Sequence, residues 1–243
     1  MKICTWDCLG PHHNSDEETK KWIENTKWLK CNFPADLYVI QECSELQVDK
    51  VRDATDGWKY AAWYGDDVDW FMRGTAIFSD NRYFTEREEF FHNPNFRYIV
   101  PYHIHADNLD FILYNVWTKA KPQNPKYKHE AYYFYENNVR EALKFYKETG
   151  HLEDSILIGD FNFGKDFQAM DKSFGLFVKE YGFETPCIDP KLKTYFANNG
   201  SSYFNDICFG KNLSVSLKSQ STSNDMGKRS DHIPLVFEVT NKA

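Results

Sequence analysis

Short apolar runs recur along the whole chain and constrain its fold more than any other feature of the sequence. Each run is too short for a stable helix, and each is either apolar throughout or alternates apolar with polar residues, as strands do. Helix-like segments lie between several of them, so the pattern indicates a sheet-rich α/β domain. The expected strands are residues 2–6, 37–41, 59–64, 74–78, 97–104, 110–117, 155–159, 204–209 and 233–239.

Helix signals mark three other segments. Ser15 and the acidic residues after it can cap a helix whose apolar positions follow at near-helical spacing. A second helix is expected over residues 130–149, ended by Gly150, and a third over residues 166–181, ended by Gly182. A sheet with two apolar faces needs cover on both, so we expect two layers of sheet covered by helices.

The length and composition of the chain bound its organisation. The chain has 243 residues, of which 42% are hydrophobic and 17% aromatic, enough to bury a substantial core. It contains no internal repeat, no low-complexity tract and no Pro-, Gly- or Ser-rich linker. We therefore expect a single domain over residues 1–243.

Two features bear on the compartment. No apolar run is long enough to span a bilayer, and Met1-Lys2 leads directly into a strand-like segment. The six cysteines are scattered and form no C-x-x-C pair, which favours reduced thiols, although an even count also permits disulfides. We expect a soluble, cytoplasmic protein.

The formal net charge of −7 argues against a protein that holds nucleic acid by bulk electrostatics. The charge does not exclude a nuclease. Carboxylates gathered around a divalent metal make a protein more acidic, while the bound ion restores positive charge where a phosphate must lie. Net charge therefore leaves both possibilities open.

Polar side chains stand at the ends of several expected strands. Mg²⁺ prefers oxygen ligands from one or two carboxylates, so acidic groups at neighbouring strand ends suit it. A histidine beside an aspartate supplies a base near neutral pH. Together these are the parts of a site for phosphoester hydrolysis. The residues are Asp7, Glu42, Asp160, Asn162, Asp206 and the pair Asp231-His232.

A set of sequence words resembles the endonuclease/exonuclease/phosphatase superfamily, whose members share the deoxyribonuclease I-like fold. The resemblance spans nearly the whole chain, and it rests on the order and spacing of the words more than on any one of them. It implies a four-layer α/β/β/α sandwich with the polar residues meeting at one end of the paired sheets. The words are KICTWD, DLYVIQE, RGTAIFS, FILYNVW, ILIGDFN, FNDICF and SDHIPLVFEV.

The resemblance also implies roles for individual residues. Asp160 and Asn162 match the pair that activates the attacking water and contacts phosphate, and Glu42 matches the metal-binding glutamate. His232 matches the catalytic histidine, and Asp206 matches the aspartate that orients it, although the neighbouring Asn205 competes for that role.

Two positions depart from the family pattern. Asp7 stands where relatives usually carry Asn, and its added charge either binds metal directly or repels a phosphate. Trp117 stands where relatives place a Tyr or His near the phosphate. An indole donates one hydrogen bond and accepts no proton. Trp117 therefore either stacks on the substrate or packs in the interior.

The resemblance implies a metal-dependent phosphoester hydrolase that works by in-line attack of water. Mg²⁺, or Mn²⁺, is expected on Glu42 with help from Asp7 and Asp231, and the expected substrate contacts are Asn162, Trp117 and Lys119. A nuclease or nucleotide phosphodiesterase is the leading hypothesis, with nucleic acid or a nucleotide as substrate and no obligate protein partner. The alternatives are a small-molecule phosphatase of the same fold and a catalytically silent binding module.

Simpler interpretations accompany these. Asp160 and Asn162 also suit a turn, and Glu42 also suits a solvated strand end. His103 and His105 alternate on an expected strand with no carboxylate partner evident, which is typical of ordinary surface or core histidines.

Overall fold

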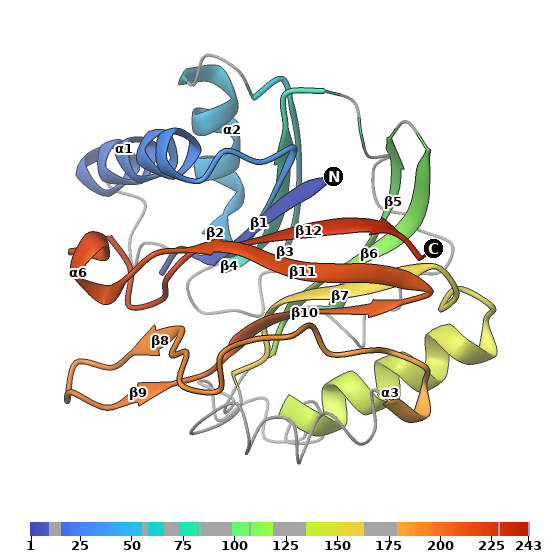
Figure 1. Cartoon of the computed structure of the whole chain (residues 1–243). Helices are drawn as coiled ribbons and strands as arrows, with labels where there is room; N and C mark the ends of the chain where they lie inside the picture. The colour runs from blue at the N-terminus through green and yellow to red at the C-terminus, as the bar shows by residue number, and fades with distance from the viewer. Residues whose placement is uncertain are drawn as a thin grey trace, which may run out of the picture.

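Two β-sheets stacked on one another form the centre of the molecule (Figure 1). The computed structural model describes residues 1–9, 16–54, 58–65, 73–81, 83, 99–106, 108–118, 135–162, 179–227 and 229–242. Side chains from facing strands of the two sheets share one hydrophobic core.

The larger sheet has six strands in the order β11-β12-β1-β2-β4-β3. β1 and β2 run parallel, and β12 pairs with β1 in the antiparallel sense. The strands are β1 (Lys2–Asp7), β2 (Leu37–Ser44), β3 (Tyr60–Gly65), β4 (Arg73–Ser79), β11 (Leu213–Gln220) and β12 (Leu235–Asn241).

The smaller sheet has four strands in the order β10-β7-β6-β5. β6 and β7 run parallel, while β5 and β10 are antiparallel to their neighbours. The strands are β5 (Ile99–Ala106), β6 (Leu109–Trp117), β7 (Ser155–Asp160) and β10 (Asp206–Lys211). A separate two-stranded ribbon consists of β8 (Tyr195–Phe196) and β9 (Ser202–Tyr203).

Helices cover the outer faces of the two sheets (Figure 1). On the larger sheet lie α1 (Asp16–Asn32) and α2 (Glu45–Ala54), and Trp22 of α1 packs against Phe78 of β4 with ring centroids 6.3 Å apart. On the smaller sheet lies α3 (Tyr135–Glu148), where Tyr146 packs against Tyr114 of β6 at 4.5 Å. The short helix α6 (Ser223–Met226) precedes β12. The expected four-layer α/β/β/α arrangement is confirmed.

A buried polar contact links the two sheets close to the strand ends. The side-chain amide of Gln41 on β2 donates to Asn115 Oδ1 on β6 over 2.9 Å, and the Asn115 amide donates to the carbonyl of Ala76 on β4 over 3.1 Å. Buried amides of this kind are stable only when their partners are fixed. The contact therefore holds the larger and smaller sheets in one register.

Gly159 permits β7 to lie close against its neighbour β6 at this point. Its φ is 140°, and a Cβ atom there would lie 2.0 Å from the carbonyl oxygen of Val116 and 3.0 Å from Gln41 Nε2. A Cβ atom cannot lie 2.0 Å from a backbone oxygen, so the residue before Asp160 must be glycine. The glycine of the GDFN word thus has a packing role.

All the expected strands are present, within a few residues at each end, and several elements were missed. β11 reads LSVSLKSQ, in which Leu213, Val215 and Leu217 form a short apolar face, but serine and lysine fill the other positions and only Leu213 is fully buried. α2 was missed because it is a short helix with few buried side chains, Val48 and Val51 among them. Edge elements of this kind bury too little surface to leave a strong pattern.

The expected helices are met where the structure describes them. α1 begins at Asp16, and α3 ends at Glu148, with Gly150 at a φ of 78°. Most of the expected third helix lies outside the described residues, although Gly182 has a φ of 85°, which suits a helix end. Among the described residues, no helix is both long and apolar enough to cross a membrane.

Candidate active site

The carboxyl ends of the parallel strands of both sheets meet at one end of the molecule. Asp7 is the last residue of β1 and pairs with Gln41 on β2. Asp160 is the last residue of β7 and pairs with Trp117 on β6 and with Asp206 on β10. Since β1 contacts β7 across the core, the ends of the two sheets bring their acidic residues together.

Three buried side chains form the centre of this site. One ligand atom each from Asp7, Asp160 and His232 lies within 4.8 Å of the other two. The backbone of His232 is fixed from β1: Trp6 Nε1 donates to its carbonyl over 3.0 Å. Ser230 Oγ donates to the carbonyl of Asp7 over 2.7 Å and accepts from the His232 amide over 3.0 Å. Sequence-distant segments thus hold the cluster rigidly.

The His232 ring pairs with Asp206, as the sequence predicted. Nδ1 of His232 lies 2.9 Å from Asp206 Oδ2, and both side chains are buried. Asp206, and not the neighbouring Asn205, occupies this place, since it is the Asp206 carboxylate that hydrogen-bonds with His232 Nδ1. The pairing orients the imidazole, with its other nitrogen available to the cluster.

The charges around His232 favour its protonated form. Burial lowers the pKa of the imidazole, but the nearby carboxylates of Asp206, Asp7 and Asp160 outweigh burial and raise the pKa well above its ordinary value. An imidazolium at this position places a fixed positive charge beside the acidic residues.

Asp160 and Asn162 form a tight turn at the end of β7. The Asn162 amide donates to Asp160 Oδ1 over 2.8 Å, and its φ is 50°, a left-handed conformation that Asn tolerates. The Asn162 side-chain nitrogen donates to the carbonyl of Thr118 over 2.7 Å and also to Asp160 Oδ2. Both interpretations of this pair therefore apply: the residues build a turn, and the turn delivers Asp160 to the cluster.

The two central carboxylates are poorly compensated without a cation. Burial and the nearby charge of Glu42 raise the pKa of Asp7 well above its ordinary value. Burial likewise raises the pKa of Asp160, against the opposing effect of His232. Asp7 Oδ1 accepts from the Leu9 amide over 3.0 Å, whereas Oδ2 is buried and has no hydrogen-bond partner among the described residues. Such a set of oxygen donors fits a hard divalent ion.

Glu42 lies beside the cluster and is not part of it. The sequence predicted a strand end at this residue, but β2 continues to Ser44 and carries a bulge between Gln41 and Cys43. Glu42 adopts a φ of 56° in that bulge, and its carboxylate forms an ion pair with Arg73 of β4. In this conformation Asp7, Asp160 and His232 converge more closely than the predicted metal set of Glu42, Asp7 and Asp231.

Of the remaining predicted residues, Trp117 packs in the interior. Its side chain is 2% exposed, and the Arg73 guanidinium lies 5.6 Å from the ring centroid. This geometry matches the packing interpretation and leaves little surface for a substrate to stack on. Lys119 lies outside the described residues.

Asp231 lines a cavity of about 310 Å³ at the edge of the site. Its Oδ1 atom is buried and has no hydrogen-bond partner among the described residues. The remaining lining mixes apolar and small polar side chains. The lining residues are Leu9, Phe196, Asn198, Ser223, Met226, Gly227, Ser230 and Asp231.

Two further residues lie at this site that were not predicted from the sequence. Arg73 is the first residue of β4 and is 4% exposed. An arginine directly before the apolar run 74–78 was the available sequence signal, because a buried arginine needs an acidic partner. The ring centroid of Tyr195 lies 4.7 Å from that of His232, and the backbones of the two residues form an isolated antiparallel β-bridge. No local pattern around Tyr195 indicates this contact, because it depends on the path of a long loop.

Searches of known proteins agree with the geometry at the level of the fold. No family model and no curated protein matches the sequence. Among solved structures, the chain is similar to a functionally unknown conserved protein from Enterococcus faecalis, with a TM-score of 0.66, 18% identity and 100% of both chains covered. It is also similar to an endonuclease/exonuclease/phosphatase family protein from Leptotrichia buccalis, with a TM-score of 0.64, 15% identity and 99% of each chain covered.

A 3'-5' exonuclease from Neisseria meningitidis is similar as well, with a TM-score of 0.62, 17% identity, and 98% of this chain and 99% of that chain covered. The chain thus has the deoxyribonuclease I-like fold of the endonuclease/exonuclease/phosphatase proteins. The fold that the sequence words implied is confirmed.

Proposed function

We propose that the chain is a metal-dependent phosphoester hydrolase, a nuclease or nucleotide phosphodiesterase, carried by a single domain over residues 1–243 and acting in the cytoplasm. The observation that supports it best is the buried Asp7–Asp160–His232 cluster, backed by the His232–Asp206 pair. The fold shared with nucleases and phosphatases adds support. All six cysteines are free, as is typical of a reducing compartment.

A divalent cation, Mg²⁺ or Mn²⁺, would be held by Asp7 and Asp160, with Glu42 and Asp231 within the surrounding acidic shell. When bound, it supplies charge that neutralises phosphate oxygens and the leaving oxygen. Asp7 has a buried oxygen without a partner, which suits direct ligation. The Asp in place of the family's Asn then strengthens the cation site.

The chain's own residues would carry the proton and charge steps. Asp160 orients the attacking water and accepts its proton, since its carboxylate is fixed by the Asn162 turn. His232, protonated and held by Asp206, donates to the phosphate oxygens as negative charge grows on them. Asn162 would be a second hydrogen-bond donor to the phosphate when its side-chain amide releases the Thr118 carbonyl and donates to the substrate instead.

The direct test measures hydrolysis of single- and double-stranded DNA, of RNA and of a generic phosphodiester, with Mg²⁺, with Mn²⁺ and with EDTA. We expect activity that EDTA abolishes and Mg²⁺ restores. Asp160→Asn should abolish it, while Asp110→Asn, the same chemical change at an exposed strand position, should not. Activity that survives EDTA, or that survives Asp160→Asn, would contradict the proposal. Absence of activity on every substrate would favour the binding-module alternative.

A small-molecule phosphatase is the second candidate, and the cavity beside Asp231 favours it. A volume of about 310 Å³ lies at the lower end of ordinary ligand pockets and would hold a sugar or nucleoside but no polymer. Released phosphate from nucleotides and sugar phosphates, measured beside polymer cleavage, separates the two candidates. Met226→Trp, which narrows the cavity, should impair small substrates selectively.

A further inference from the structure

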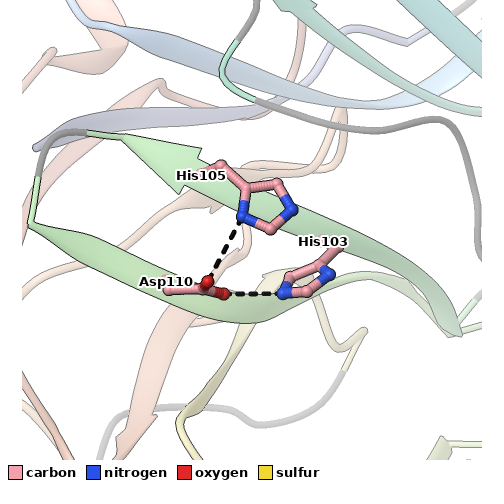
Figure 2. Close-up of side chains that lie close together, drawn as sticks. All are labelled: His103, His105 and Asp110. Atoms are coloured by element: carbon pink, nitrogen blue, oxygen red, sulfur yellow. Dashed lines mark hydrogen bonds and ion pairs between the residues drawn. The ribbon is translucent and has the colours of Figure 1, made fainter.

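A second group of metal-type side chains lies on the β5–β6 hairpin, on the smaller sheet. Asp110 of β6 is directly opposite His105 of β5 in the register of the hairpin. His103 Nε2 lies 2.6 Å from Asp110 Oδ1, and His105 Nδ1 lies 3.3 Å from Asp110 Oδ2 (Figure 2). The expectation that these histidines have no carboxylate partner is therefore wrong. The partner comes from the neighbouring strand.

Strand alternation puts the three side chains on one face. Residues at alternate positions of a strand share a face, and residues opposite one another in a pair point the same way. Asn115 of β6 faces the larger sheet and Tyr114 faces α3, so Asp110 lies on the α3 side. There the hairpin is open to solvent, since His103, His105 and Asp110 have side-chain exposures of 33%, 46% and 69%. A dissolved ion can reach the group.

The group is separate from the candidate active site. Asp110 and Trp117 stand seven residues apart on β6, which is about 23 Å at ~3.3 Å per residue. Trp117 pairs with Asp160, so the hairpin group stands at the opposite end of the smaller sheet. A change at one group can therefore be made without disturbing the other.

The three side chains are held by rigid backbone. The His105 amide donates to the carbonyl of Tyr83 over 2.7 Å, and the hairpin turn is fixed where Asn241 Nδ2 donates to the carbonyl of Asn108 over 3.0 Å. The ligand atoms of the group all lie within 4.8 Å of one another. Neighbouring ligands of a tetrahedral zinc ion stand about 3.3 Å apart, given bonds of about 2.0–2.1 Å. Small side-chain rotations would accommodate an ion.

We propose that His103, His105 and Asp110 form a solvent-open binding site for a divalent transition metal of the Zn²⁺ class. Two imidazole nitrogens and one carboxylate oxygen are donors that Zn²⁺, Ni²⁺ and Cu²⁺ accept, whereas Mg²⁺ and Ca²⁺ prefer oxygen alone. Three protein ligands leave at least one position for water or for a side chain of another molecule. The ion would also cross-link the edge strand β5 to β6.

The test is calorimetric titration of the full chain with Zn²⁺ in millimolar Mg²⁺, which occupies the proposed catalytic site. We expect one Zn²⁺ per chain at the hairpin and a rise in Tm on binding. His105→Ala and Asp110→Asn should each weaken binding by at least about 10-fold, because losing a ligand costs more than the 10–100-fold typical of its supporting partners. Both variants should keep their phosphoesterase activity, if the protein has any.

Two controls make the outcome decisive. The double change His12→Ala and His13→Ala removes the other closely spaced histidine pair of the sequence and should leave Zn²⁺ binding intact. Asp160→Asn should also leave it intact. No Zn²⁺ uptake by the unmodified chain, uptake that is unchanged in His105→Ala, or uptake that disappears in either control would overturn the proposal. Circular dichroism of each variant checks that it is folded.

Discussion

The molecule contains two clusters of histidine and aspartate that use the same residue types in opposite surroundings. Asp7, Asp160 and His232 are buried where the two sheets meet, whereas His103, His105 and Asp110 lie on an exposed hairpin. Burial raises the pKa of Asp110, but the hydrogen bonds and charges of the two imidazoles together outweigh it and lower the pKa below its ordinary value. Burial raises the pKa of Asp160 against the effect of His232. Burial, and not residue type, decides which cluster suits demanding chemistry.

The comparison has an energetic meaning. Water screens the exposed charges, so their pairing contributes little to stability. The buried charges have lost their hydration and depend on one another, so each is expensive to leave unpaired. Charged groups that are held in fixed positions, are shielded from water and need a cation to compensate their negative charge are suited to stabilising the charge that develops in a reaction.

Catalysis should differ most between the clusters. His232→Gln, which removes the positive charge in the buried cluster, should lower turnover by on the order of 10² to 10³, as for loss of an electrostatic stabiliser. His105→Gln is the matched change in the exposed cluster and should leave turnover within error. Steady-state kinetics with Mg²⁺ on the best substrate of the panel measures both. Equal effects of the two changes would refute the distinction drawn here.

Stability should differ next. Asp206→Ala removes the buried partner of His232 and should reduce the free energy of unfolding by about 3–5 kcal/mol. Asp110→Ala removes an exposed partner of two histidines and should reduce it by less than about 1 kcal/mol without added metal. Urea unfolding at neutral pH in EDTA gives both values. A loss at Asp206 as small as that at Asp110 would mean that the buried pair is well solvated.

The buried cluster should also make the metal-free protein sensitive to pH. The raised pKa of Asp7 means that its ionisation destabilises the folded state once the pH rises above the unfolded value of about 3.9. The raised pKa of His232 acts in the same direction, because its stabilising charge is lost as the pH rises through the folded pKa. Tm in EDTA should therefore fall from pH 5 to pH 8.

Asp7→Asn tests that prediction. The change removes a buried charge but keeps an oxygen for the Leu9 amide, so Tm in EDTA at pH 8 should rise by a few degrees, at about 2–4 °C per kcal/mol. The slope of Tm against pH should become shallower. Differential scanning fluorimetry across the pH range measures it, with Asp110→Asn as the control. A lower Tm for Asp7→Asn would contradict the account of the site's electrostatics.

The smallest effect concerns Trp117, which lies on the same strand as Asp110 but at the buried end. Trp117→Phe keeps an aromatic ring beside Arg73, so we expect a KM within error of the unmodified value. Kinetics and urea unfolding of this variant check the expectation. A large rise in KM with unchanged stability would instead support the interpretation that Trp117 stacks on the substrate.

Much of the fold could be predicted from the sequence, but less of the candidate site could. The strand series and the acidic residues at its ends follow from local pattern, because burial of a strand and the end of that strand both show in adjacent residues. Asp7 and Asp160 were found in this way, whereas Asp206 lies within an expected strand and His232 directly precedes one. Their convergence also needs the parallel pairing of β1 with β2 and of β6 with β7.

Contacts between strands account for what was missed. The ion pair of Glu42 with Arg73 depends on a bulge in β2. No residue type in that strand predicts that Glu42 adopts a left-handed backbone conformation there. Asp110 joins His103 and His105 only through the hairpin register, although the short turn between the two expected strands signals that pairing. Residue propensity and periodicity describe single strands and do not predict which residues of neighbouring strands lie in contact.

Binding of Mn²⁺ to the full chain, followed by water-proton relaxation, tests the central claim without knowledge of the substrate. The account predicts that Mn²⁺ binds, that Mg²⁺ displaces it, that Asp160→Asn weakens it strongly, and that Asp110→Asn leaves it unchanged. Failure of Mn²⁺ to bind, or binding that Asp160→Asn leaves unchanged, would contradict the claim that the buried cluster is a metal site.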